Sequence, residues 1–275
     1  MKKYELTERY IELSGRKLYR IRALKVKDGV LGGFIEKEEN LSQDGDAWVR
    51  DNAWVRDNAQ VRDNAQVDGN AWVRGNAWVY GNAIVRDDAE VRDNATVCNN
   101  ATVCDNAEVR DNATVCGDAI VRDDTIVCDN ATVCGDAILC GGAILCGDAL
   151  VSSNADYATI KGFGLKCCTI TFFRRNNGEI GVASGCFYGN LEEFRERVFA
   201  THRNTKMANE YLRIAELMEY HFAKQKRTKK RRLHGHGEDK LCQVKYEMKY
   251  EVLVMILKTI YALSMFILIM MLWNR

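Results

Sequence analysis

The sequence predicts a mainly β protein built around a parallel β-solenoid of about six triangular coils. Three observations lead to this fold class. Ala47 to Asn154 is an uninterrupted run of 18 Ala-x-Val-x-x-x hexapeptides, 108 residues in all. Alanine and valine stand two positions apart, so both lie on one face of a short strand. The residues that close each repeat are mostly Asp, Asn and Gly, which tolerate left-handed backbone conformations at turns.

Each hexapeptide therefore predicts one strand and one corner. Three such sides close a triangle, so one coil takes 18 residues and residues 47–154 form six coils. Stacked coils pair as parallel strands about 4.8 Å apart, which gives a prism of about 29 Å. Valine and alanine fill its interior, and asparagines stack in ladders along the corners. A period of six does not fit the 3.6-residue repeat of a helix.

The open ends of a solenoid need caps, because they expose unpaired strand edges. Residues 1–46 predict an N-terminal β cap, since Tyr4–Leu6 and Lys17–Ile21 alternate polar and apolar residues.

Residues 155–223 predict a small α+β C-terminal cap. Strands at 171–175 and 179–183 flank Asn176-Asn177-Gly178, a hairpin signal. Asn190 and Glu193 form a capping-box pattern that opens a helix at 191–200, and a second helix is expected at about 206–224.

The last part of the chain predicts a basic linker at 224–251 and a transmembrane helix at 252–273. The 22 residues of 252–273 contain one charged residue, Lys258, and are long enough to cross a bilayer. The basic run 224–232 would contact anionic lipid and hold the N-terminal bulk in the cytoplasm. The expected location is therefore cytoplasmic, with a membrane tail anchor. A buried or self-associating helix at 252–273, and nucleic-acid binding by the basic run, are the alternatives.

Charge is distributed unevenly along a chain whose formal net charge is only +1. Residues 47–154 carry 8 basic and 17 acidic residues, a net of −9, whereas 195–275 carry 17 and 8, a net of +9. An acidic solenoid is a poor general binder of nucleic acid, so no nucleic-acid partner is favoured.

The Val-Arg-Asp-Asn-Ala pattern resembles the hexapeptide repeat of left-handed β-helix proteins, with a small residue four positions after an aliphatic one. Within that class it is similar to bacterial and phage-encoded proteins described as transferases or as polymer-forming. The lead-in Gly32–Glu36 through Leu41–Asp46 resembles the entry segment of that group. The likeness covers about residues 1–223 and implies a left-handed solenoid. The C-terminal tail departs from it.

Many proteins of the resembling class transfer acyl groups from coenzyme A or acyl carrier protein, with a histidine near the coils as general base. Related carbonic anhydrases bind a metal through three coil histidines. Here His202, His221, His234 and His236 all lie outside the repeats, and no loop interrupts the coils. We therefore predict no catalytic residue, no cofactor and no metal. An acyl-coenzyme A-dependent acyltransferase that uses His202 or His221 at a coil edge remains an alternative.

One outward column stacks arginines directly above one another and is a candidate anion-binding site for polyanions or acidic glycans. Its members are Arg56, Arg74, Arg92 and Arg110. The simpler interpretation, which we favour, is a solvated face compensated by the adjacent Asp57, Asp93 and Asp111.

Apolar residues at other outward positions are candidates for an interface, because exposed apolar stripes need a cover. They are Trp48, Trp54, Trp72, Trp78 and Tyr80 on the early coils, and Ile120, Ile138, Ile126 and Ile144 on the later ones. The cover would be residues 1–46, the C-terminal helices or another subunit.

A further column places Thr96, Thr114 and Thr132 beside Cys98, Cys116 and Cys134. The spacing is compatible with a disulfide, a soft-metal site or ice binding, but free thiols are the favoured state in a reducing cytosol.

Taken together, these features predict a non-catalytic scaffold or self-associating solenoid, held at a membrane. Self-association into a homo-oligomer is the expected partnership.

Overall fold

A computed structural model describes residues 2–24, 29–163 and 169–229 of the chain. The predicted transmembrane helix 252–273 and most of the predicted linker 224–251 lie outside these residues. The chain divides into two units at residues 223 and 224. The fold below is that of the first unit and of the helix that continues to Lys229.

The solenoid has three walls, as predicted, and strands of one wall follow each other at intervals of 18 residues. Val85, for example, pairs in parallel with Val67 on one side and with Val103 on the other. We name the walls sheets A, B and C. Sheet A contains β5 (Trp54–Val55), β8 (Trp72–Val73), β11 (Glu90–Val91), β14 (Glu108–Val109), β17 (Ile126–Val127) and β20 (Ile144–Leu145). Sheet B contains β6 (Gln60–Val61), β9 (Trp78–Val79), β12 (Thr96–Val97), β15 (Thr114–Val115), β18 (Thr132–Val133) and β21 (Leu150–Val151). Sheet C contains β4 (Trp48–Val49), β7 (Gln66–Val67), β10 (Ile84–Val85), β13 (Thr102–Val103), β16 (Ile120–Val121) and β19 (Ile138–Leu139).

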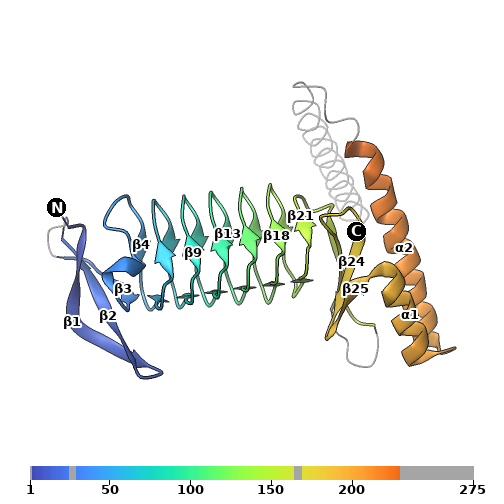
Figure 1. The fold of residues 1–275 in the computed structure, drawn as a ribbon, viewed down its shortest axis with the longest axis horizontal. Coiled ribbons are helices and arrows are strands. Elements are labelled where there is room, and N and C mark those ends of the chain that lie inside the picture. The colour runs from blue at the N-terminus through green and yellow to red at the C-terminus, as the bar shows by residue number, and fades with distance from the viewer. Residues whose placement is uncertain (1, 25–28, 164–168, 230–275) are drawn as a thin grey trace, which may run out of the picture. The chain divides into compact units, whose positions relative to one another are not determined.

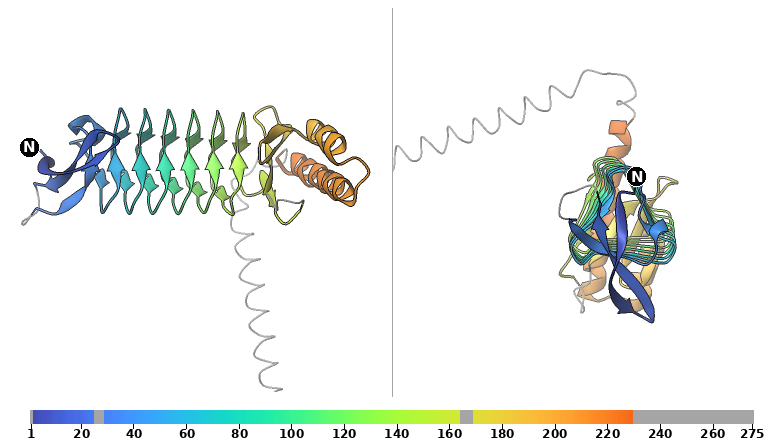
Figure 2. Two further views of the ribbon diagram at one scale, coloured as in Figure 1. Left: turned by 90° about the horizontal axis from the view of Figure 1, so that it is seen from below. Right: turned by 90° about the vertical axis from the view of Figure 1, so that its left-hand side faces the viewer.

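The inward positions form one apolar core. The repeat valines from Val49 to Val151 and the repeat leucines are fully buried, as are the alanines two positions earlier. Figure 1 shows the strands of successive coils side by side, and Figure 2 shows the coils superposed when they are viewed along the stacking direction.

The corners adopt the expected left-handed backbone, with a φ of 60° at Asp57 and 61° at Asp93. Asparagine side chains hydrogen-bond from coil to coil, which confirms the predicted ladders. The longest ladder runs through Asn58, Asn76, Asn94, Asn112 and Asn130, with N···O distances of 2.9–3.3 Å.

The solenoid has about seven turns rather than six, because part of the predicted cap joins it. The strand β3 (Leu31–Ile35) pairs in parallel with β5, and Leu41 bridges in parallel to Val61. The short 3₁₀ turn η1 (Glu38–Asn40) lies between them. Asn40 is fully buried, and its amide donates to the carbonyl oxygens of Asp57 and Ala59.

The Ala-x-Val period does not extend into this added turn, which is why the repeat count missed it. Two glycines let the chain approach the next coil closely. A Cβ on Gly33 would lie 2.4 Å from the carbonyl oxygen of Ala53, and one on Gly32 would lie 2.6 Å from that of Val49.

The remaining N-terminal residues form the predicted β cap. The strands β1 (Tyr4–Leu13) and β2 (Arg16–Ala23) pair antiparallel, and β2 pairs antiparallel with β3. Tyr4 is fully buried, and its hydroxyl donates to the carbonyl oxygen of Leu41 at 2.7 Å.

The C-terminal cap is α+β, as expected. Its antiparallel sheet consists of β22 (Tyr157–Ile160), β23 (Ile170–Arg174), β24 (Ile180–Ser184) and β25 (Phe187–Asn190). The predicted hairpin is confirmed, with Arg174 opposite Ile180.

Two helices pack on this sheet through a second apolar core around Phe172. The helix α1 (Leu191–His202) begins with the predicted capping box, since Asn190 and Glu193 exchange side chain-to-backbone hydrogen bonds. The helix α2 (Lys206–Lys229) ends beyond the expected 224, so it enters the predicted linker. Within the part of the chain that the structure describes, no helix combines the length and the apolarity needed to cross a bilayer.

Candidate functional site

The predicted arginine column lies along one edge of sheet A. The backbone N–H of Arg56, Arg74, Arg92 and Arg110 donates in each case to the inward residue of the next strand, at 2.9–3.0 Å. This places the four side chains on consecutive coils, as expected.

The carboxylates of Glu90 and Glu108 neutralise much of this column. Nε of Arg74 donates to Glu90 at 2.6 Å, and Nε of Arg92 donates to Glu108 at 2.9 Å. Arg110 lies 3.3 Å from Glu108, so both glutamates contribute to a continuous ion-pair network.

The corner aspartates complete the compensation, as the sequence suggested. Arg92 and Arg110 each donate to the next residue, Asp93 and Asp111, at 2.8 Å. Sequence reasoning did find these aspartates but missed the two glutamates. The signal was available, because residue i+16 occupies the outward position of the same wall one coil later. No finding tests anion binding by the column, which stays a prediction.

The aromatic residues of the first coils have separate environments. Trp54 is only 7% exposed because Leu18 and Phe34 of the N-terminal residues cover it. Trp72 stacks on Trp54 with ring centroids 4.9 Å apart and remains 45% exposed. Residues 1–46 therefore cover part of the predicted belt.

Two other predicted aromatics lie on different walls. Trp48, on sheet C, is half-buried with its ring 6.1 Å from that of Tyr4. Trp78, on sheet B, is 42% exposed and has the Arg62 guanidinium 4.9 Å above its ring. Tyr80 follows the strand that holds Trp78, and a hydrogen bond with the Cys98 thiol raises the pKa of its hydroxyl.

The isoleucines divide between two walls. Ile126 and Ile144, on sheet A, are partly buried against the main core. Ile120 and Ile138 follow each other on sheet C, where Ile138 is 37% exposed. Ile84 lies on the same column with a similar exposure, although sequence reasoning left it out of the interface set.

Free thiols occupy the position after the inward valine or leucine on the later coils. Their columns contain Cys98, Cys116 and Cys134 at sheet B, Cys128 and Cys146 at sheet A, and Cys104 and Cys140 at sheet C. Cys128 and Cys146 share a hydrogen bond, which lowers the pKa of Cys128 and raises that of Cys146.

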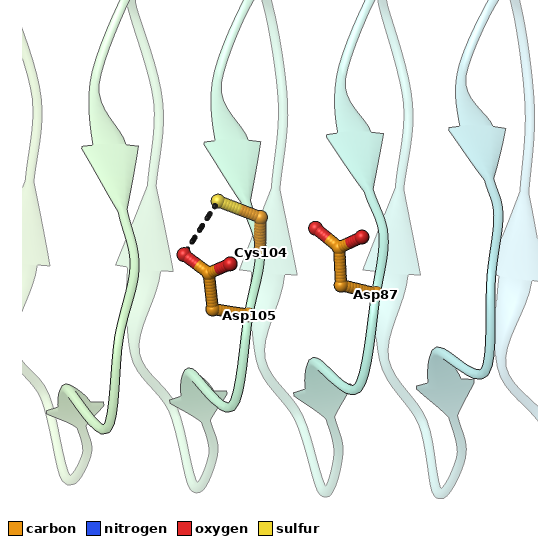
Figure 3. A group of neighbouring side chains, drawn as sticks. All are labelled: Asp87, Cys104 and Asp105. Atoms are coloured by element: carbon orange, nitrogen blue, oxygen red, sulfur yellow. Dashed lines mark hydrogen bonds between the residues drawn. The ribbon is translucent and has the colours of Figure 1, made fainter.

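Two groups of donor atoms have the spacing of a metal site, although none was predicted. They are Asp87, Cys104 and Asp105 (Figure 3), and Asp111, Cys128 and Asp129, with donor atoms within 4.8 Å of one another. Each combines a Cys-Asp pair with the corner aspartate of the preceding coil, a signal readable at 18-residue spacing.

Both groups already use their oxygens. Arg86 donates to Asp87 at 2.7 Å, and Arg110 donates to Asp111 at 2.8 Å. The Cys104 thiol donates to Asp105 at 3.6 Å, and burial raises its pKa to about 11. A protonated thiol beside engaged carboxylates is a poor start for a metal centre.

The two histidines of the acyltransferase alternative lie on the helices of the C-terminal cap. The His202 ring is 5.7 Å from that of Tyr211, and the His221 ring is 5.1 Å from that of Phe222. His234 and His236 lie outside the described residues. No known protein-family model matches this chain, and no curated protein sequence does.

Proposed function

We propose that the protein is a non-catalytic scaffold that self-associates through the outward face of sheet C. We further propose that its solenoid is a left-handed β-helix of the hexapeptide-repeat type. The repeat pattern and the resemblance described above support this finer assignment.

The observation that carries the proposal is the character of one column. The outward residues of sheet C are Trp48, Gln66, Ile84, Thr102, Ile120 and Ile138, none of them charged. Ile84 and Ile138 are 36% and 37% exposed, so the apolar members face solvent. Exposed apolar stripes of this kind favour a protein partner.

A second copy of the chain is the partner that best fits this column. Its rungs repeat at the same spacing of about 4.8 Å, so isoleucines of one copy would meet those of the other at regular intervals. A two-fold contact of this kind uses the same surface on both copies.

Light scattering after size-exclusion chromatography tests the proposal, with the full chain in a mild detergent. The monomer mass is 31.2 kDa, and we expect a multiple of it for the unmodified chain. Ile120→Lys would place a charge at the centre of the column and return the mass to that of the monomer.

The matched control is Thr114→Lys, at the equivalent strand position of sheet B. Both residues are half-buried outward residues of neighbouring strands in the chain. We expect Thr114→Lys to keep the assembly. A monomeric unmodified chain, or equal loss in both variants, would contradict the use of sheet C.

The membrane tether and the acyltransferase alternative stay predictions. The tether depends on 252–273 and on the basic run at 224–232, and retention of the chain in membranes after a carbonate wash tests it. Binding of acetyl-coenzyme A at millimolar concentration is the measurement that would favour the enzyme.

A further inference from the structure

Three thiols form a continuous ladder beside sheet B. The backbone N–H of Cys98 donates to Val115, that of Cys116 to Val133 and that of Cys134 to Val151, at 2.9–3.0 Å. The cysteines therefore occupy the same position on three consecutive coils. The Cys116 thiol is hydrogen-bonded to both Cys98 and Cys134, so the middle sulfur contacts the other two.

The ladder is reachable from solvent and is free of charged neighbours in its own column. Cys98 is buried, whereas Cys116 and Cys134 are half-buried. The residues that follow the three cysteines are Asn99, Gly117 and Gly135, where Cys104 and Cys128 are followed by aspartates. Burial and the neighbouring thiols raise the pKa of Cys116. The donors here are sulfur alone.

The coil spacing distinguishes two uses of such thiols. Neighbouring coils repeat equivalent atoms at about the strand spacing of 4.8 Å. A disulfide needs Cβ atoms about 3.5–4.5 Å apart, which is shorter than this repeat. A metal ion between two sulfurs in line spans about 4.6 Å, from two metal–sulfur bonds of about 2.3 Å each. The repeat therefore fits a bridging ion better than a disulfide.

We propose that Cys98, Cys116 and Cys134 form a binding site for a soft, two-coordinate metal ion of the Cu(I) class. Thiolates select such ions, and an all-sulfur site without carboxylates does not suit Mg²⁺ or Ca²⁺. The ion bridges Cys116 to one neighbour at a time. Binding breaks two S–H bonds, forms two S–Cu bonds and releases two protons to solvent, with no change of oxidation state.

The middle position gives the site a distinctive response to mutation. Cys116 belongs to both neighbouring pairs, so its loss removes the site. Cys98→Ser leaves the pair of Cys116 and Cys134, and Cys134→Ser leaves the pair of Cys98 and Cys116. A site that needed all three sulfurs would fail in every variant.

The test titrates the reduced full-length chain with Cu(I) under anaerobic conditions, in competition with a chromophoric Cu(I) chelator. We expect Cys116→Ser to lose one tightly bound Cu(I) per chain, and Cys98→Ser to keep it. Cys140→Ser is the matched control, since Cys140 is also half-buried but has Arg122 one coil before it in its column. All other cysteines are unchanged in each comparison, so their copper cancels.

A second measurement protects the result against a change of fold. With one equivalent of Cu(I), Cys116 in the unmodified chain should react at least tenfold more slowly with iodoacetamide, as read by peptide mass spectrometry. Cys116→Ala would replace Cys116→Ser if circular dichroism shows that the serine variant unfolds. Equal copper uptake by Cys116→Ser and the unmodified chain, or equal losses in Cys116→Ser and Cys140→Ser, would overturn the proposal.

Discussion

Sheets A and C belong to the same coils and share the same inward valines, yet their outward columns differ. Along sheet A the column begins with Trp54 under the N-terminal residues and continues to Glu90 and Glu108, which pair with arginines. Along sheet C the column is uncharged, and Ile84 and Ile138 face solvent.

The difference shows that one backbone geometry supports two surfaces of opposite character. The inward positions hold the coil together, so the outward positions are free to vary from wall to wall. On sheet A they bind other parts of the same chain. On sheet C a partner outside the chain is needed to bury them, which is the basis of the proposed self-association.

Removal of a covered aromatic should have the largest effect on stability. We expect Trp54→Ala, on sheet A, to lower the free energy of unfolding by about 3 kcal/mol, because it leaves a cavity beneath Leu18 and Phe34. Ile84→Ala, on sheet C, should cost less than about 1 kcal/mol in a monomer, since its side chain is already solvated. Urea unfolding measures both, and equal costs would contradict the contrast between the two walls.

The ion-pair network of sheet A should respond to salt. Glu108→Gln leaves Arg92 and Arg110 without a shared carboxylate, and we expect a loss of about 1 kcal/mol at low ionic strength. The loss should shrink in 1 M salt, where the Debye length is about 3 Å. Thr102→Val, on the uncharged column of sheet C, is the control. Its effect should not depend on salt, and a salt-independent Glu108→Gln would contradict the network.

The smallest effect concerns the end of sheet A that meets the C-terminal cap. Burial tends to raise the pKa of Asp148, but hydrogen bonds from Arg175 and Tyr188 outweigh it and hold the pKa below its ordinary value. A lowered pKa in the folded state means that the stabilisation exists above the unfolded-state pKa of about 3.9 and is lost as the pH falls through the folded value.

Asp148→Asn should therefore cost about 1 kcal/mol at pH 7 and nothing once the pH lies below the folded pKa. Thermal unfolding from pH 7 down to pH 2 measures the difference between the two chains. A difference that persists unchanged to the lowest pH would show that the ion pair is not its source.

Sequence reasoning could predict the repeat, the corners and the hairpin because each depends on neighbours within a few residues. It could not predict the added turn at 31–46, because β3 pairs with β5 without carrying the Ala-x-Val period. It placed the arginines in one column correctly but did not show that Glu90 and Glu108 would neutralise them. Those pairs join residues 16 apart on different coils, so only a correct stacking reveals them.

The amino-acid sequence by itself determined the solenoid, because a six-residue period places every valine inward and every corner on Asp, Asn or Gly. Only the tertiary structure decided which outward residues are covered, paired or exposed. Trp54 and Trp72 occupy equivalent repeat positions, yet one is 7% exposed and the other 45%. The physical reason is that burial of an outward side chain depends on what packs against its wall, and the repeat contains no information about that.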